Sequence, residues 1–507
     1  MNKNIEVRND DWPSHIPHPA FSSFHHASRI PNPVSRIVKD ITIIGGGITG
    51  LAAAFYLQRE IAARGLSARY TLLEAGPRWG GKIVTDRERE FVIEGGPDSF
   101  IVEKKAGLQL CHDLGLGEDL IPSNEIEKKV YVLRRGRLVP FPTGFRLTIP
   151  TQLMPFVLSP LISPPGKLRM AGDLVIPRRR DTSDESLGSF IRRRFGRECL
   201  DRIAGPLLGG IFVSDPDRLS MQATFPRLLG MEREYGSLIR AARAVRKLAP
   251  PPTGPRAAGR AMFNSLRHGM GSLVDAVERQ LSGERHLNSP VASIQWRGDK
   301  PFIQPVQGPG FETDAVLLAT PASVGAKLLN ESHPDLAKKL AAFHYVSTAT
   351  LSLGYLADDI PADRPLDGFG VLIPASEGRP LVAITWASTK FRHRAPQGCA
   401  LIRVFFGGHT NEVMADWPED QLLALARAEL AQILGIRADP LFHRLYRWPK
   451  ANPQYDVGHL DRVAETEREA AARPGLWLAG SSYRGVGIPD CVQGARQAVE
   501  QIVSRLT

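Results

Sequence analysis

A glycine motif at a strand-to-helix junction most constrains what this chain can fold into. Residues 40–44 have the β-branched, apolar character of a buried strand, and residues 50–65 have the pattern of a helix. Between them, Gly45, Gly47 and Gly50 follow the spacing Gly-x-Gly-x-x-Gly. Glycine at these positions allows a tight turn and lets a pyrophosphate approach the backbone at the helix N-terminus. The motif therefore predicts a Rossmann-like unit that binds a dinucleotide.

A carboxylate and a second glycine turn extend this motif. Residues 70–73 are predicted to form the next parallel strand, and Glu74 follows at its end, where a carboxylate can accept both ribose hydroxyls. Arg78, Gly80 and Gly81 come next, so a cation lies beside a further turn. This extension is similar to that of the large flavoprotein family of amine oxidases, phytoene desaturases and protoporphyrinogen oxidases. It favours FAD over a nicotinamide cofactor.

The C-terminal segment carries the most specific pattern. Residues 478–499, LAGSSYRGVGIPDCVQGARQAV, resemble the closing motif of the protoporphyrinogen oxidase family. The backbone from Gly485 to Gly487 can approach a planar ring closely. The helix that begins near Pro489 directs its positive end toward that ring, which stabilises negative charge on a reduced flavin.

Four shorter segments are similar to the same family: residues 94–100, 206–226, 267–277 and 368–374. The chain departs from the family pattern at Phe212, where tyrosine is usual, and at Ser214, where glycine is usual. The resemblance runs from about residue 40 to residue 506.

The resemblance implies noncovalent FAD contacts along most of the chain. These are Gly45, Gly46, Gly47, Ile48, Thr49, Gly50, Glu74, Ala75, Arg78, Gly81, Lys82, Gly96, Pro97, Asp98, Ser99, Val291, Ser481, Val486, Gly487 and Ile488. Val291 lies in a predicted strand, where its backbone can reach the adenine, and it equally fits an ordinary core position.

The resemblance also implies the chemistry. The substrate is expected to be a porphyrinogen, protoporphyrinogen IX or coproporphyrinogen III, which loses six electrons as three hydrides to FAD. Dioxygen reoxidises the flavin and forms hydrogen peroxide. The backbone carbonyl of Gly210 is expected to orient the macrocycle, although a tight helix-packing glycine explains this position equally well. No side-chain base stands out in the sequence.

A porphyrinogen needs apolar walls for its faces and cations for its carboxylates. Leu372, Trp386 and Phe391 are candidate walls, although each also fits the core of a sheet. Lys128 and Lys129 are candidates for the carboxylates, because the family often has a basic residue just before this strand.

The net charge of +11 favours an anionic partner, such as a carboxylate-bearing substrate, a nucleic acid or an acidic lipid surface. Arginines of residues 178–180 and 192–194 are not interleaved with aromatic residues, so no nucleic acid is expected. We expect these arginines to face solvent mostly, with a peripheral membrane contact left open. A flavin amine oxidase or a carotenoid desaturase on the same scaffold is the alternative enzyme.

A chain of 507 residues is long enough for several domains. We predict an α/β fold, α+β overall, with a Rossmann-like FAD-binding domain built from residues 38–125, 251–330 and 448–507. Residues 126–250 are predicted to form a helical lobe, residues 331–447 a mixed-sheet substrate domain, and residues 1–37 a disordered extension. The four cysteines lie far apart and no signal or membrane-spanning segment is visible, which favours the cytoplasm. No metal site is expected, and a homodimer is the default assembly.

Overall fold

The computed structural model describes residues 38–142, 145–146, 149–150, 157–248 and 261–506. Residues from Val38 onward form one compact unit. The predicted extension over residues 1–37 lies outside the described residues.

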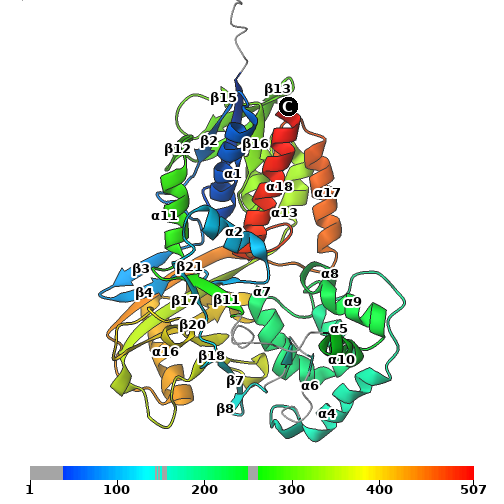
Figure 1. The fold of residues 1–507 in the computed structure, drawn as a ribbon, viewed down its shortest axis with the longest axis vertical. Helices are drawn as coiled ribbons and strands as arrows, with labels where there is room; N and C mark the ends of the chain where they lie inside the picture. Colours follow the sequence, from blue (N-terminus) through cyan, green and yellow to red (C-terminus); the bar gives the residue numbers. More distant parts are fainter. Residues whose placement is uncertain (1–37, 143–144, 147–148, 151–156, 249–260, 507) are drawn as a thin grey trace, which may run out of the picture. The chain divides into compact units, whose positions relative to one another are not determined.

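A five-stranded parallel sheet forms one layered part of the compact unit (Figure 1). The strand–glycine–helix pattern folds as predicted, because β1 is followed directly by α1, Ile48–Arg64. Residues far apart in the sequence build this sheet: Ile44 pairs with Leu73 on one side and with Leu318 on the other. The order is β12 (Glu284–His286), β2 (Ala68–Leu73), β1 (Lys39–Ile44), β16 (Ala315–Leu318) and β22 (Leu476–Leu478).

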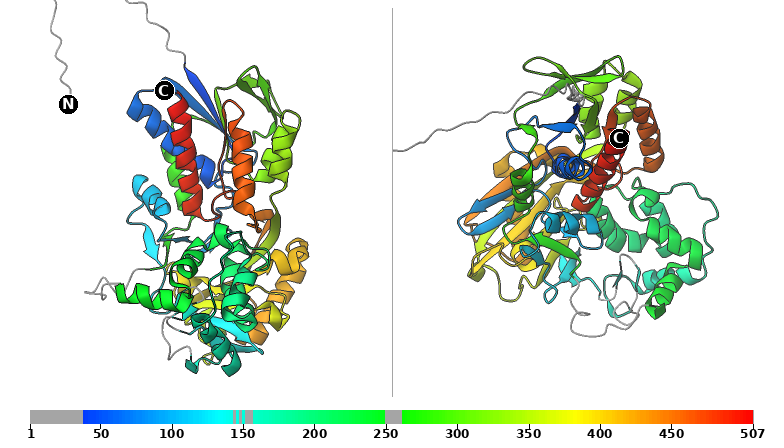
Figure 2. Two further views of the ribbon diagram at one scale, coloured as in Figure 1. Left: turned by 90° about the vertical axis from the view of Figure 1, so that its right-hand side faces the viewer. Right: turned by 45° about the horizontal axis from the view of Figure 1, so that its top comes forward.

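Helices cover both faces of this sheet (Figure 2). Ile43 and Leu317 point to one face, where they pack with helices α1, α2 (Lys105–Asp113), α11 (Gly271–Gln280) and α18 (Ile488–Leu506). Ile44 and Leu318 point to the other face, where they pack with α12 (Ala322–Leu329), α13 (Pro334–Ala341), α17 (His459–Ala471) and a small sheet of β13 (Val291–Arg297), β14 (Lys300–Pro305) and β15 (Phe311–Glu312).

A seven-stranded sheet forms the second layered part. It is antiparallel except where β18 pairs with β7, which is a parallel contact. Helix α16, Glu419–Leu434, packs on one face through Leu422, Ala426 and Leu430. The order is β21 (Phe442–Pro453), β17 (Tyr345–Leu356), β20 (Cys399–Gly407), β19 (Ala383–Trp386), β18 (Gly368–Leu372), β7 (Lys129–Arg134) and β8 (Arg137–Pro140).

Strands β7 and β8 form a hairpin that turns at Arg135 and Gly136, and both turn residues have positive φ. These strands fall in the range 126–250, for which the sequence predicts a helical lobe, yet they form the edge of the seven-stranded sheet. Because successive side chains of a strand point to opposite faces, β7 contributes to two cores: Val132 packs on the lobe, whereas Leu133 packs in the core of the sheet.

The rest of residues 157–248 is helical and has its own apolar core, which includes Phe190, Ile203 and Leu208. Residues Leu200–Gly209 form a π-helix with Pro206 inside it. The other helical segments are α4 (Pro164–Ala171), η1 (Gly172–Leu174), α5 (Leu187–Phe195), α6 (Arg197–Cys199), α7 (Gly210–Phe212), α8 (Met221–Thr224), α9 (Pro226–Tyr235) and α10 (Leu238–Leu248).

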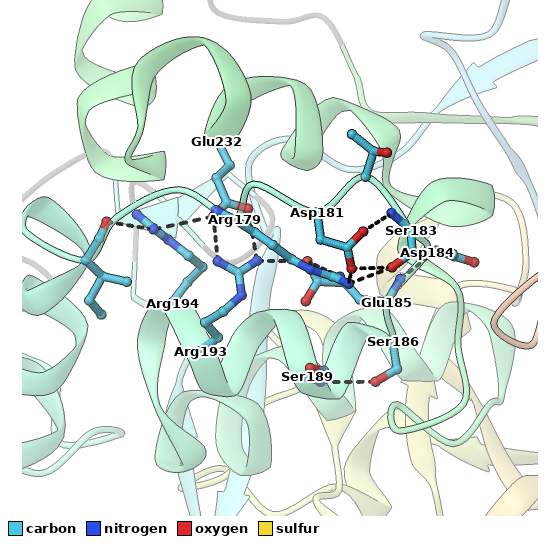
Figure 3. Close-up of polar contacts among 12 residues, drawn as sticks. Arg179, Asp181, Ser183, Asp184, Glu185, Ser186, Ser189, Arg193, Arg194 and Glu232 are labelled. Carbon is cyan, nitrogen blue, oxygen red and sulfur yellow. Dashed lines mark hydrogen bonds and ion pairs between the residues drawn. The ribbon is translucent and has the colours of Figure 1, made fainter.

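An ion-pair cluster in this lobe corrects the expectation of solvent exposure for two arginines of these runs, Arg193 and Arg194 (Figure 3). Arg178, Arg180 and Arg192 are exposed, as expected. Arg194 and Asp173 have completely buried side chains, and Arg194 Nε donates to Asp173 Oδ1 at 2.6 Å. Arg193 donates to Glu185 at 2.8 Å and also pairs with Glu232. Arg193 and Arg194 therefore hold the lobe together and do not form a solvent-facing patch.

Short segments connect these layers. They are β3 (Thr85–Glu88) with β4 (Phe91–Glu94), β5 (Phe100–Ile101) with β11 (Phe263–Leu266) and β6 (Leu120–Pro122), β9 (Phe145–Arg146) with β10 (Ile149–Pro150), and η3 (Ala357–Asp359), η4 (Ala375–Glu377), α14 (Ala387–Lys390), α15 (Gly408–Asn411) and η5 (Glu412–Asp416). Among the helices that the structure describes, none has the length and apolar character needed to cross a membrane.

Candidate active site

The N-terminus of α1 forms the first part of the site. Its cap is the backbone of Gly47, with no side-chain hydrogen bond to the cap and no acidic residue in the first turn. A Cβ on Gly50 would lie 1.9 Å from the carbonyl oxygen of Gly45, so only glycine lets the helix approach the strand this closely. The first turn, including Ile48 and Thr49, thus keeps its amide groups available to an anion, as a pyrophosphate requires.

Glu74 lies directly after β2 and closes the glycine turn. Its carboxylate accepts hydrogen bonds from the amides of Gly46 at 2.6 Å and Gly76 at 2.8 Å. Ala75 beside it is exposed. Each carboxylate oxygen has further lone pairs, so this position fits a ribose-binding acid.

The second glycine turn packs against the first. A Cβ on Gly81 would lie 3.0 Å from the Cα of Gly47. Arg78 donates to the carbonyls of Trp79 at 3.2 Å, Gly81 at 2.6 Å and Ile83 at 3.1 Å, so its guanidinium orders its own loop.

Lys82 joins segments from opposite ends of the chain. Its ammonium donates to the carbonyl of Ala451 and lies 3.5 Å from Ser481 Oγ. Burial lowers the pKa of Lys82. In the described part of the chain this ammonium has no carboxylate within ion-pair distance, which suits a site for an electron-rich cofactor.

The segment Gly96–Ser99 lies against Lys82, because a Cβ on Gly96 would be 1.8 Å from the Lys82 carbonyl oxygen. The Asp98 carboxylate accepts from Lys390 Nζ at 2.8 and 3.1 Å and from Ser99 Oγ at 2.6 Å. Burial alone would raise the pKa of Asp98, but the Lys390 ammonium holds it at about 2. The Asp98 carboxylate is thus already paired, so the predicted FAD contact of this segment, which includes Pro97, would fall to its backbone.

The C-terminal motif is fixed by hydrogen bonds to Tyr455. The Tyr455 hydroxyl accepts from the amide of Gly485 at 2.7 Å and donates to the carbonyl of Ser481 at 2.8 Å. Val486 packs on the lobe core, and α18 begins at Ile488. Tyr455 is a site residue that was not predicted, because a tyrosine two residues after the end of a strand has no motif of its own.

The N-terminal turn of α18 is fixed by contacts of Asp490 with Gly487 and with Lys104, which lies outside this helix. Asp490 Oδ2 accepts from the amide of Gly487 at 3.3 Å, and the Asp490 carboxylate also accepts from Lys104 Nζ at 2.7 and 2.8 Å. This acid offsets part of the positive end of α18 that the sequence predicts to face the flavin.

Gly210 begins α7 directly after the π-helix. A Cβ at Gly210 would have no described heavy atom within 4 Å. Two residues on, the ring of Phe212 lies 6.1 Å from that of Tyr455. The structure thus links the predicted catalytic glycine to the C-terminal motif through two aromatic side chains.

The remaining candidates are scattered. Val291 begins β13 and packs against the core cluster that contains Ile44 and Leu73, near the glycine turn. Trp386 and Phe391 are each 1% exposed. Their role as substrate walls stays a prediction, as does that of Leu372, which is half-buried and packs on the lobe core.

Both candidate lysines already have carboxylate partners. Lys128 pairs with Glu125 at 3.1 Å, and Lys129 pairs with Asp367, which also accepts from the Tyr131 hydroxyl. A substrate carboxylate at either lysine would therefore compete with an existing ion pair.

Comparison with known proteins identifies the family. Residues 48–503 match the family described as flavin containing amine oxidoreductase. The chain belongs to this family. Its cofactor is FAD, and the cradle of glycine turns, Glu74 and unpaired amides fits that cofactor.

Several relatives of this flavin-containing oxidoreductase match over nearly its whole length. Coproporphyrinogen III oxidase of Bacillus subtilis (strain 168) is 35% identical over 92% of this chain and 98% of that protein. Protoporphyrinogen oxidase 1, chloroplastic, of Spinacia oleracea is 30% identical over 93% of this chain and 85% of that protein. A crystal structure of a provisionally named protoporphyrinogen oxidase from Exiguobacterium sp. 255-15 matches with a TM-score of 0.82 at 32% identity, over 92% of this chain and 99% of that one.

Proposed function

We propose that this enzyme oxidises a porphyrinogen to the corresponding porphyrin in heme biosynthesis, with dioxygen as the final acceptor and hydrogen peroxide as the second product. The observation that carries the proposal is the link between the π-helix end at Gly210 and the C-terminal motif through Phe212 and Tyr455. The same two segments carry the resemblance to porphyrinogen oxidases in the sequence.

FAD, when bound, supplies the hydride acceptor. The chain's own residues bind and position: Glu74 and the first turn of α1 hold the dinucleotide part, and Tyr455 fixes the turn from Ser481 to Gly485. The Gly210 carbonyl orients the macrocycle. Protons of the pyrrole nitrogens leave through solvent, so the reaction needs no side-chain base.

We further propose coproporphyrinogen III as the preferred substrate. The bacterial coproporphyrinogen III oxidase is more similar in sequence than the chloroplast protoporphyrinogen oxidase, at 35% against 30% identity. A net charge of +11 also favours the more anionic tetra-acid.

The test uses the FAD-loaded protein under air with coproporphyrinogen III and, separately, protoporphyrinogen IX, and follows porphyrin fluorescence and peroxide. We expect both to be oxidised with a higher kcat/KM for coproporphyrinogen III. Formation of neither porphyrin contradicts the proposed activity, and oxidation of a panel of primary amines instead would favour an amine oxidase.

The double variant Lys128→Ala, Lys129→Ala tests the carboxylate contact. We expect kcat/KM to fall because KM rises while kcat stays the same. Lysines that only bind the substrate carboxylates affect formation of the complex and not the reaction within it. Lys300→Ala is the matched control, since Lys300 also pairs with an acid, Asp314 at 3.2 Å, but lies on β14.

The proposal includes the cytoplasm as location and a peripheral contact of the lobe with an acidic membrane surface. Leu158, Leu168 and Val175, on or beside α4, are 74%, 77% and 82% exposed. Cosedimentation with phosphatidylglycerol vesicles at low and high salt tests this contact: loss at high salt indicates electrostatic attachment through the basic lobe, whereas persistence at high salt together with weakening by Leu168→Asp indicates apolar insertion. A homodimer is part of the proposal, and analytical ultracentrifugation tests it.

A further inference from the structure

In the segment between β4 and β5, backbone carbonyl groups are hydrogen-bonded to other described residues, whereas most backbone amide groups are not. The carbonyl of Gly95 accepts from Arg403 Nη2 at 2.8 Å, Trp448 Nε1 at 3.0 Å and Thr350 Oγ1 at 3.3 Å. The Gly96 carbonyl accepts from Arg403 Nη1 at 2.8 Å. Strands β17, β20 and β21 of the seven-stranded sheet thus hold the carbonyl groups of this segment.

The amide groups of the same segment are left without partners. In the part of the chain that the structure describes, the N–H groups of Gly96, Asp98 and Ser99 have no hydrogen-bond acceptor. These residues are half-buried. Because backbone donors away from water are nearly always paired, three such donors in four residues point to an acceptor-rich ligand.

Arg403 is an unusual buried cation. It is 6% exposed, and among the described residues no carboxylate lies within ion-pair distance of it. Its two Nη atoms bond Gly95, Gly96 and Thr350, and its Nε has no partner. A buried guanidinium without a paired acid is costly, so the chain keeps it at a price in stability.

The neighbouring acids are committed elsewhere. Glu94 accepts from the amide of Met270 at 2.8 Å and from the Thr85 hydroxyl at 2.6 Å, and it pairs with Arg394 at 3.3 Å. Asp98 pairs with Lys390. Arg403 therefore serves the two backbone carbonyls and not a salt bridge.

We propose that Arg403 is a positioning residue for FAD: it holds the Gly95 carbonyl against the sheet and so turns the amide of Gly96, which belongs to the same peptide group, toward the cofactor. Through the Gly96 carbonyl it also fixes the Gly96–Pro97 peptide, which leads into the amides of Asp98 and Ser99. Because β20 also belongs to the sheet predicted to bind substrate, this contact fixes the FAD segment relative to that sheet. The inference rests on FAD contact by residues 96–99.

The test compares Arg403→Met with a matched control, Arg447→Met. Arg447, on strand β21 of the same sheet, makes the same kind of double contact, donating to the carbonyls of Ala415 and Trp417 at 2.6 Å each, but it holds η5. The apparent Kd of FAD is measured by titrating the apoprotein, and the flavin-to-protein ratio is measured after gel filtration. Neither measurement needs a porphyrinogen, so failure of the proposed activity is seen separately.

We expect Arg403→Met to raise the Kd of FAD by about tenfold or more, with Arg447→Met within about twofold of wild type. Arg403→Lys keeps the charge but loses one of the two carbonyl contacts, so we expect a Kd of FAD between those of wild type and Arg403→Met. The resolved long-wavelength absorbance band of bound flavin should likewise be weaker than in wild type and stronger than in Arg403→Met. If Arg403→Met does not fold, Arg403→Lys against Arg447→Lys gives the same comparison. A wild-type Kd in the Arg403 variants, or an equal loss in the Arg447 controls, would overturn the assignment.

Discussion

The hydroxyl of Tyr455 accepts a hydrogen bond from the amide of Gly485 at 2.7 Å. The same hydroxyl donates to the carbonyl of Ser481 at 2.8 Å, and the tyrosine ring stacks on His459 at a centroid distance of 3.8 Å. One fixed side chain therefore ties both ends of the turn that begins the C-terminal motif.

Tyr455→Phe removes this tie and leaves two backbone groups unpaired. We expect a loss of about 1–3 kcal/mol in the free energy of unfolding and weaker FAD retention. Thermal unfolding and flavin content after gel filtration measure both effects. Tyr446→Phe is the control, because that hydroxyl bonds Asp86 in an exposed position. A Tyr455→Phe protein as stable as wild type would contradict the role of the bridge.

Arg194→Met breaks the buried pair with Asp173. An uncompensated buried carboxylate costs about 3–5 kcal/mol, so we expect the lobe to unfold at a lower denaturant concentration. Urea unfolding followed by far-UV circular dichroism, which reports on the helices of the lobe, measures the change. Arg197→Met is the control, because Arg197 is 86% exposed and pairs only with Asp201 at 3.5 Å. Equal midpoints for the two variants would refute this prediction.

Glu94 predicts a pH dependence. Burial raises the pKa of Glu94 from 4.5 to about 7, against the opposing effect of Arg394. Because the folded pKa is the higher one, the stability from the protonated carboxyl is complete below about pH 4.5 and is lost as the pH rises through about 7. Glu94→Gln stays neutral, so its stability relative to wild type should rise by roughly 3 kcal/mol at most across this interval. Urea unfolding at several pH values checks this, and a pH-independent difference would be the contrary result.

Glu74→Ala removes the carboxylate that closes the glycine turn. We expect the Kd of FAD to rise by about tenfold or more, because charge-assisted hydrogen bonds are among the strongest. Glu74→Gln keeps one oxygen acceptor and should retain an intermediate amount. Glu284→Ala is the control, because this acid lies on the neighbouring strand β12 with 69% exposure of its side chain. Full flavin content in purified Glu74→Ala protein would show that the assignment is mistaken.

The parts of the site with local patterns were predictable. The glycine turn, Glu74 and the C-terminal motif depend on spacing within a few residues, and the structure forms the strand, turn and helix from those same residues. The fold class was predictable for a related reason, because short apolar strands such as β1 are followed by glycine turns and helices in the order typical of an α/β fold.

Long-range contacts were not predictable. The arginine runs read as a charged surface because their partners, such as Asp173 and Glu232, lie tens of residues away. Trp386 lies in a buried core, although its type also suits a substrate wall. Arg403 is a single arginine within an otherwise apolar strand, β20, and only the fold brings its guanidinium to Gly95.

The order of strands in the parallel sheet has a consequence for biosynthesis. The central strand β1 is made first, its neighbour β16 long after it, and the edge strand β22 only near the end of the chain. At roughly 5–20 residues per second, translation separates β1 from β22 by on the order of 20–90 s. During that interval the early strand has an open edge, which is the state in which nascent chains aggregate. The parallel sheet is therefore complete only when β22 has been made, and the C-terminal motif that follows β22 joins the glycine turn last.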